Sequence, residues 1–168
     1  VDADGIDIDF EADANCSGWA LNKGDKDCMK CETDSIIINY IKRLKELLPK
    51  HKLITAATTG TGAYGTPEFP ATEQKPEYGI NTGRWVNILR QQNIDEIFDM
   101  SYDGGNCFNV IESFKSFVSL TKNKTPVYIG LEVPYEPWPK RPDKENHVLS
   151  VEETKKYANY CMTDKNCK

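Results

Sequence analysis

The stretch Asp4-Gly5-Ile6-Asp7-Ile8-Asp9-Phe10-Glu11 decides the fold that this sequence predicts. From Ile6 to Glu11 the residues alternate between apolar and acidic, which is the two-residue period of a β-strand. The carboxylates of Asp7, Asp9 and Glu11 therefore lie on one face of the strand and the apolar side chains on the other. Like charges spaced about 7 Å apart along a strand repel each other. We therefore expect a raised pKa for at least one of these groups, which then holds a proton.

Outward from this strand, the hydrophobic pattern alternates between strands and helices. One strand followed by one helix, four times over, predicts an α/β fold built from parallel βαβ units. The longest segments between these elements all follow strands, and in α/β barrels such loops build the active face. The predicted strands are 6–11, 53–58, 96–102 and 126–133, and the helices after them begin at Thr33–Ser35, at Asn81 or Thr82, at Phe108 and at the Ser150–Glu153 capping box.

Length and charge exclude several classes of protein. The chain of 168 residues suffices for one domain but is short for a closed eight-stranded α/β barrel. The net charge is −5 and no basic stripe is present, so nucleic acid is not an expected partner. No apolar run reaches membrane-spanning length, so no membrane partner is expected. Because the chain opens directly on the acidic strand, we expect it to be a fragment of a larger protein.

The six cysteines favour disulfides over metal binding. An even number is typical of proteins from an oxidising compartment, and predicts secretion. The alternative is a zinc site on Cys28 and Cys31, but neither histidine lies at a suitable spacing from that pair. The triplets that begin at Asn15 and Asn123 match the N-glycosylation pattern and add slight support for secretion. A calcium loop at Asp2–Gly5 is not favoured, because its glycine stands at the fourth position instead of the sixth. We predict no metal and no cofactor.

Two motifs carry a resemblance to a known family. Asp4, Asp7, Asp9 and Glu11 match all four acidic positions of the DxxDxDxE motif of glycoside hydrolase family 18, which includes chitinases and endo-β-N-acetylglucosaminidases. The segment 98–103 resembles the Met-x-Tyr-Asp motif of the sixth strand of that family, and it follows in the expected order. The resemblance implies a (β/α)8 TIM barrel. Residues 1–168 would form a partial catalytic domain with strands four to seven but not the last strand. The rest of the barrel is expected from flanking sequence or a partner chain.

The same resemblance implies a role for each motif residue in substrate-assisted, retaining hydrolysis. Glu11 would protonate the glycosidic oxygen, while the acetamido carbonyl of the sugar attacks the anomeric carbon. Asp9 would orient the acetamido N–H, and Asp7 would share a proton with Asp9. Tyr102 would hydrogen-bond the acetamido oxygen with the assistance of Asp103.

Other residues complete the predicted site. Met100 is expected to help bind the substrate beside the motif tyrosine, and Asp4 and Gly5 are expected to support the strand structurally. Trp19 and Trp138 lie in loops that follow strands, where they are candidates for stacking on sugar rings. Packing within the loop is an equally good interpretation of both tryptophans.

A glycine-rich segment and a third tryptophan have structural interpretations. Thr58-Thr59-Gly60-Thr61-Gly62 lacks the lysine of a phosphate-binding loop, so it does not predict a nucleotide site. Trp85 lies on the apolar side of a predicted helix and is expected in the core. Glu132, at the end of the last predicted strand, either faces the cleft or pairs with a cation.

Together these observations predict a secreted glycosidase that cleaves β-1,4-linked N-acetylglucosamine polymers such as chitin. Three alternatives remain open. The enzyme acts on the chitobiose core of N-glycans, or the protein is a chitinase-like lectin that binds carbohydrate without turnover, or the chain is a structural component. The presence of Glu11 with Asp7, Asp9 and Tyr102 favours an enzyme.

Overall fold

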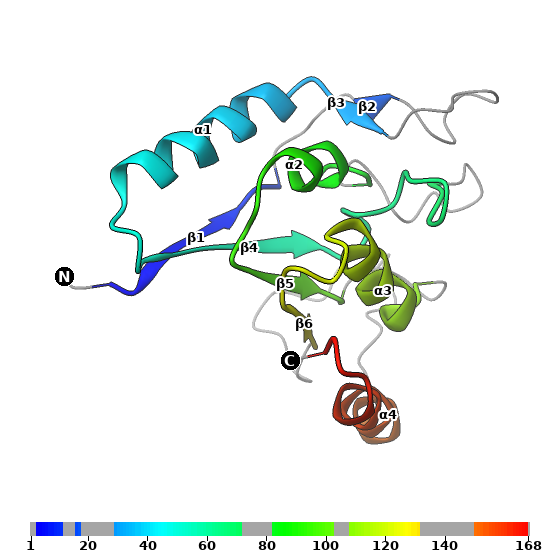
Figure 1. The fold of residues 1–168 in the computed structure, drawn as a ribbon. Coiled ribbons are helices and arrows are strands. Elements are labelled where there is room, and N and C mark those ends of the chain that lie inside the picture. Colours follow the sequence, from blue (N-terminus) through cyan, green and yellow to red (C-terminus); the bar gives the residue numbers. More distant parts are fainter. Residues whose placement is uncertain are drawn as a thin grey trace, which may run out of the picture.

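The computed structural model describes residues 3–11, 16–17, 29–71, 82–102, 108–131 and 150–167. Along these residues the main strands and helices alternate, as predicted from the sequence (Figure 1). The chain forms an α/β fold, and the paired strands of its larger sheet are all parallel. The elements are β1 (Gly5–Asp9), β2 (Cys16–Ser17), β3 (Lys30–Cys31), α1 (Asp34–Leu47), β4 (Leu53–Thr59), α2 (Val86–Gln91), β5 (Glu96–Met100), α3 (Val110–Leu120), β6 (Val127–Gly130) and α4 (Val151–Thr163).

The parallel sheet has the strand order β1-β4-β5-β6, which is the order of these strands in the chain. Its register places Asp9 beside Ala57 and Ala57 beside Phe98, which in turn pairs with Tyr128. Residues paired in this way point to the same face of a sheet. The acidic residues of β1 therefore share a face with the aromatic residues of β5 and β6.

The helices pack on the other face of the sheet, where the core lies. Ile8 is buried between two exposed carboxylates of β1, so the predicted period of two is confirmed for this strand. Apolar side chains of the helices cover this face and leave Asp7, Asp9 and Phe98 exposed on the opposite one. The core includes Ile8, Ile54, Ala56 and Ile97 from the sheet, Ile37, Ile41 and Leu44 from α1, Ile88 and Leu89 from α2, and Phe114 and Phe117 from α3.

Several element boundaries differ from the prediction. β1, β5 and β6 end at Asp9, Met100 and Gly130, before the predicted ends at 11, 102 and 133. α3 begins at Val110 instead of Phe108, because the side chain of Asn109 accepts hydrogen bonds from two N–H groups of the first turn. The capping box that opens α4 is confirmed. Helix α1 begins where predicted, at 34.

The start of α2 was predicted too early, at Asn81 or Thr82. Asn81 lies outside the described residues, and 82–85 form a turn, so that α2 begins at Val86. The reason is the backbone of Gly83, whose φ of +74° is incompatible with a right-handed helix. Trp85 is fully buried, which confirms its predicted place in the core.

Two disulfides are formed, Cys16–Cys31 and Cys161–Cys167. The first closes a short antiparallel ribbon of β2 and β3, which lies between the predicted strand 6–11 and the helix after it, where no strand was predicted. It also uses the thiol of Cys31, so the alternative of a zinc site on that residue is wrong. Within the described segments, no cluster of three His, Cys, Asp or Glu side chains is arranged to hold a metal ion. Cys28 and Cys107 lie outside those segments.

No helix in the described part of the chain is long and apolar enough to cross a bilayer.

A second, smaller core lies among the connections that follow β1 and β4. Met29, Tyr64 and Ala71 are buried there, with the half-buried Cys16 and Phe69 packed against them. The N–H of Met29 also donates to the carbonyl of residue 65 across this core, at 3.0 Å. These contacts hold the described parts of the two connections together at the carboxyl ends of the strands.

Gly83→Ala is expected to destabilise the protein by about 1–3 kcal/mol. Gly83 has a left-handed backbone, and a Cβ atom there would overlap the side chain of Met29. Urea unfolding of the single variants Gly83→Ala and Met29→Ala and of the double variant measures the effect. We expect the glycine substitution to cost less in the Met29→Ala background, because the overlap is then relieved. Equal costs in the two backgrounds would assign the whole effect to the backbone.

Candidate functional site

The candidate site begins with the carboxylates of β1. Asp7 and Asp9 are exposed, and Glu11 follows two residues after the strand, also exposed. The hydroxyl of Thr55 on β4 donates a hydrogen bond of 2.5 Å to Oδ1 of Asp7. Strand register places Asp7 and Asp9 on one face of the sheet, and Glu11 follows beyond the carboxyl end of β1.

The residues of the second motif lie on β5 and just beyond it. Met100 is half-buried at the end of the strand, and Tyr102 has 38% of its surface exposed. Since parallel strands place their carboxyl ends at one edge of the sheet, Glu11 and Tyr102 lie at the same edge. Only β4 separates the two motifs, so they are about 10 Å apart.

Small side chains occupy the space between the two motifs. Thr55, Ala57 and Thr59 are the residues of β4 that share the face of the carboxylates. All three are partly exposed and lie between the acidic strand and the aromatic strand. The arrangement can bind a neutral polar ligand with hydrogen-bonding groups on one side and flat apolar faces on the other.

Two aromatic residues in this face were missed by the sequence reasoning. The rings of Phe98 and Tyr128 stack with their centroids 5.2 Å apart, and Phe98 is 39% exposed. The hydroxyl of Tyr128 donates to Glu96 at 3.3 Å, and desolvation together with the charge of Glu96 raises the pKa of this tyrosine. The alternation of Glu96, Phe98, Met100 and Tyr102 in the sequence was the signal that would have identified the first of these rings.

Asp99, the residue between these positions, points to the opposite face of the sheet. It is fully buried, and its Oδ2 lies 2.7 Å from the hydroxyl oxygen of Ser113 on α3. Burial raises the pKa of Asp99 to about 7, although the hydroxyls of Ser113 and Ser101 act in the opposite direction. Asp99 therefore lies on the helix-covered face of the sheet and not on the face of the candidate site.

The glycines of the segment 58–62 have a packing role. A Cβ atom on Gly60 would overlap the ring of Phe108, and one on Gly62 would lie 2.9 Å from the indole of Trp85. The close approach of these aromatic rings explains the glycines without any bound phosphate. Gly5 is similar, because a Cβ atom there would overlap the backbone of Leu53.

Three predicted site residues, Trp19, Asp103 and Trp138, lie outside the described residues, as does Glu132. Asp4 is described and is exposed at the entry to β1. Its carbonyl accepts a hydrogen bond from the N–H of Leu53 at 2.9 Å, which continues the pairing of β1 with β4.

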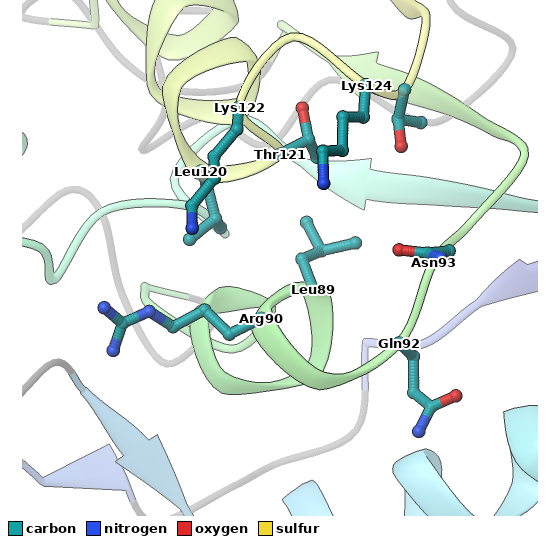
Figure 2. Close-up of a pocket in the computed structure, with 9 residues that line it drawn as sticks. Leu89, Arg90, Gln92, Asn93, Leu120, Thr121, Lys122 and Lys124 are labelled. Atoms are coloured by element: carbon teal, nitrogen blue, oxygen red, sulfur yellow. The ribbon is translucent and has the colours of Figure 1, made fainter.

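A separate cavity of about 210 Å³ lies at the other edge of the sheet (Figure 2). It is formed where α2 and α3 end, next to the amino ends of β5 and β6, and the side chain of Leu89 points into it. Its basic residues are Arg90, Lys122 and Lys124. Cations at the carboxyl ends of helices complement the helix dipole, so their position has a structural explanation. The cavity is distinct from the candidate site.

Comparisons of the chain with models of protein families, with curated proteins and with solved structures give no match.

Proposed function

We propose that this chain is part of a secreted glycoside hydrolase of the family 18 type, acting on β-1,4-linked N-acetylglucosamine. The observation that carries the proposal is the placement of Asp7, Asp9, Met100 and Tyr102. Met100 follows Asp7 and Asp9 by 91 positions or more, yet these three residues lie on one face of the sheet, and Tyr102 follows two residues beyond Met100. The two disulfides support the proposed secretion.

The proposed fold is a (β/α)8 barrel of which this chain supplies four β/α units. In such barrels the strand order follows the chain and the helices lie on one face of the sheet. The sheet of this chain has both properties, which supports the proposal. Doubly wound sheets instead reverse their strand order and carry helices on both faces. In a barrel, the face that bears Asp7, Asp9 and Phe98 would be the interior, with the site at the carboxyl ends of the strands.

In the proposed mechanism, Glu11 donates its proton to the glycosidic oxygen as the bond to the anomeric carbon breaks. The acetamido oxygen of the sugar forms a bond to that carbon at the same time, giving a cyclic oxazolinium ion. Asp9 accepts a hydrogen bond from the acetamido N–H. Asp7 is the next residue along β1 on the same face as Asp9. Tyr102 donates to the acetamido group from the other side. Glu11 then takes a proton from the water that opens the ring, and the configuration is retained.

The full-length protein is expected to release the fluorophore from a chitobioside but not from a cellobioside with the same leaving group. The two substrates differ in the acetamido group, which the mechanism requires as nucleophile. The measurement is the rate of fluorophore release from each substrate at equal concentration. Equal rates on the two substrates would exclude substrate assistance, and absence of cleavage of both would exclude the proposed activity.

A carbohydrate-binding protein without turnover is the second candidate. The stacked pair of the exposed Phe98 and the half-buried Tyr128 favours it, since flat aromatic faces bind sugar rings independently of any acid. Retention on chitin without release of fluorophore from the chitobioside would support this candidate over the enzyme. Cleavage of N-glycans instead of chitin would move the proposed substrate to the chitobiose core with the same chemistry.

A further inference from the structure

Arg84 is a charged residue in an unusual place. Its side chain is 1% exposed, although arginine is normally among the most exposed residues. It stands in the turn 82–85, directly after Gly83 and directly before the buried Trp85. Because Gly83 packs on Met29, this turn is fixed by the second core.

The guanidinium of Arg84 contacts Phe10, the residue that follows β1. Nη1 donates to the carbonyl oxygen of Phe10 at 3.5 Å, and the guanidinium carbon lies 5.3 Å from the centre of the Phe10 ring. In Figure 1 the end of β1 lies close to the start of α2, where this turn is located. One side chain therefore holds both the backbone and the ring of Phe10.

This contact lies where the pairing of β1 ends. The register of β1 with β4 stops at Asp9, so ladder hydrogen bonds do not fix the backbone at Phe10. The arginine supplies a donor there, and the planar guanidinium adds a face for the aromatic ring. The direction in which the chain continues to Glu11 is set at this position.

A buried guanidinium is costly, since it stays charged at all ordinary pH values and loses its hydration. Methionine would fill much of the same volume without that cost. Stability alone therefore does not explain why an arginine occupies this position.

We infer that Arg84 is a positioning residue for Glu11, an inference that rests on the proposed function. It acts through Phe10 by fixing the end of β1, so that the carboxyl group of Glu11 meets the glycosidic oxygen in one orientation. A general acid must lie within hydrogen-bonding distance of the atom that it protonates. Small displacements of such a group reduce turnover more than binding.

The test compares Arg84→Met, Arg84→Lys and the control Arg90→Met in the full-length protein. Arg90 is exposed on α2, the helix that directly follows the turn of Arg84, so the control makes the same chemical change in a neighbouring part of the chain. We expect Arg84→Met to lower kcat on the chitobioside by about 10–100-fold, with KM changed by less than about threefold. Arg84→Lys keeps the charge and should recover part of the loss, and Arg90→Met should match the wild type. Concentrations of folded protein are taken from unfolding curves.

A purely structural role predicts a lower unfolding temperature with an unchanged kcat per folded molecule, and that result would overturn the inference. Hydrogen exchange of the peptide that covers 6–12 provides a readout that does not depend on activity. It should be faster in Arg84→Met than in the wild type and unchanged in Arg90→Met. If the wild type does not cleave the chitobioside, the proposed function fails. Unchanged exchange in Arg84→Met would then separately contradict the positioning of Phe10 and Glu11.

Discussion

Glu11→Gln is expected to lower kcat on the chitobioside by about 10²–10⁴-fold, the usual contribution of general acid catalysis. Glutamine keeps the shape of the side chain and its capacity for hydrogen bonds, but it cannot transfer a proton. Glu11 is exposed at the carboxyl edge of the sheet, so the substitution should leave the fold intact. Steady-state kinetics of the full-length variant measure the effect, and KM should change little.

The matched control is Glu46→Gln. Glu46 is exposed on α1 and forms an ion pair of 2.8 Å with Arg43. Surface pairs of this kind contribute about 0–1 kcal/mol, so this variant should retain the activity of the wild type. Turnover by Glu11→Gln at the rate of the control would show that another group is the acid. Binding of chitin by the inactive variant would separate the loss of chemistry from a loss of the site.

The period of two in the sequence was sufficient to predict the strand that carries the acids and the direction of its side chains. The burial of Ile8 between the exposed Asp7 and Asp9 follows directly from that period. The order of the main strands and helices was equally predictable, because apolar residues recur at the spacing of each element. Local pattern also identified the capping box of α4, whose hydrogen bonds involve only neighbouring residues.

Features that depend on contacts between distant segments could not be predicted in this way. Arg84 and Asp99 are charged residue types that normally stay exposed, and nothing near them in the sequence indicates their burial. Their partners, Phe10 and Ser113, come from other elements of the fold. The late start of α2 has the same origin, since the backbone of Gly83 is held by the packing of a distant methionine.

The two faces of strand β5 carry residues with different roles. Toward the candidate site it presents Phe98 and Met100, and toward the helices it presents Asp99. The hydroxyl of Ser113 lies 2.7 Å from Asp99 and 2.5 Å from the carbonyl oxygen of Gly60. These contacts join the end of β4, the strand β5 and the helix α3 directly beneath the site.

Burial favours a proton on Asp99, whose carboxyl group shares the hydroxyl of Ser113 with the carbonyl of Gly60. A hydroxyl group has one hydrogen, and the carbonyl of Gly60 can only accept. Ser113 donates to the ionised carboxylate, whereas a protonated Asp99, favoured by the pKa of about 7 that results from burial, can donate to Ser113 and leave its hydrogen for Gly60. The folded chain then binds this proton more tightly than the unfolded chain, where the pKa of an aspartate is about 3.9. The stabilisation is therefore complete below about pH 4 and is lost as the pH rises to about 7.

Asp99→Asn is expected to remove this part of the pH dependence of stability. The amide of asparagine can donate to Ser113 as the protonated acid does, and it has no proton to lose. The free energy of unfolding of the wild type, measured relative to that of the variant, should fall by about 1.4 kcal/mol per pH unit between roughly pH 4 and 7, or about 4 kcal/mol in all. Above pH 7 the difference should be constant, with the asparagine variant the more stable.

Urea unfolding at each pH measures this difference. Asp99→Ala is the control, because it also removes the pH dependence but lacks the hydrogen bond. A constant difference in unfolding free energy from pH 4 to 8 would show that Asp99 is ionised throughout. The Ser113 hydroxyl would then alternate between donating to Gly60 and donating to the carboxylate.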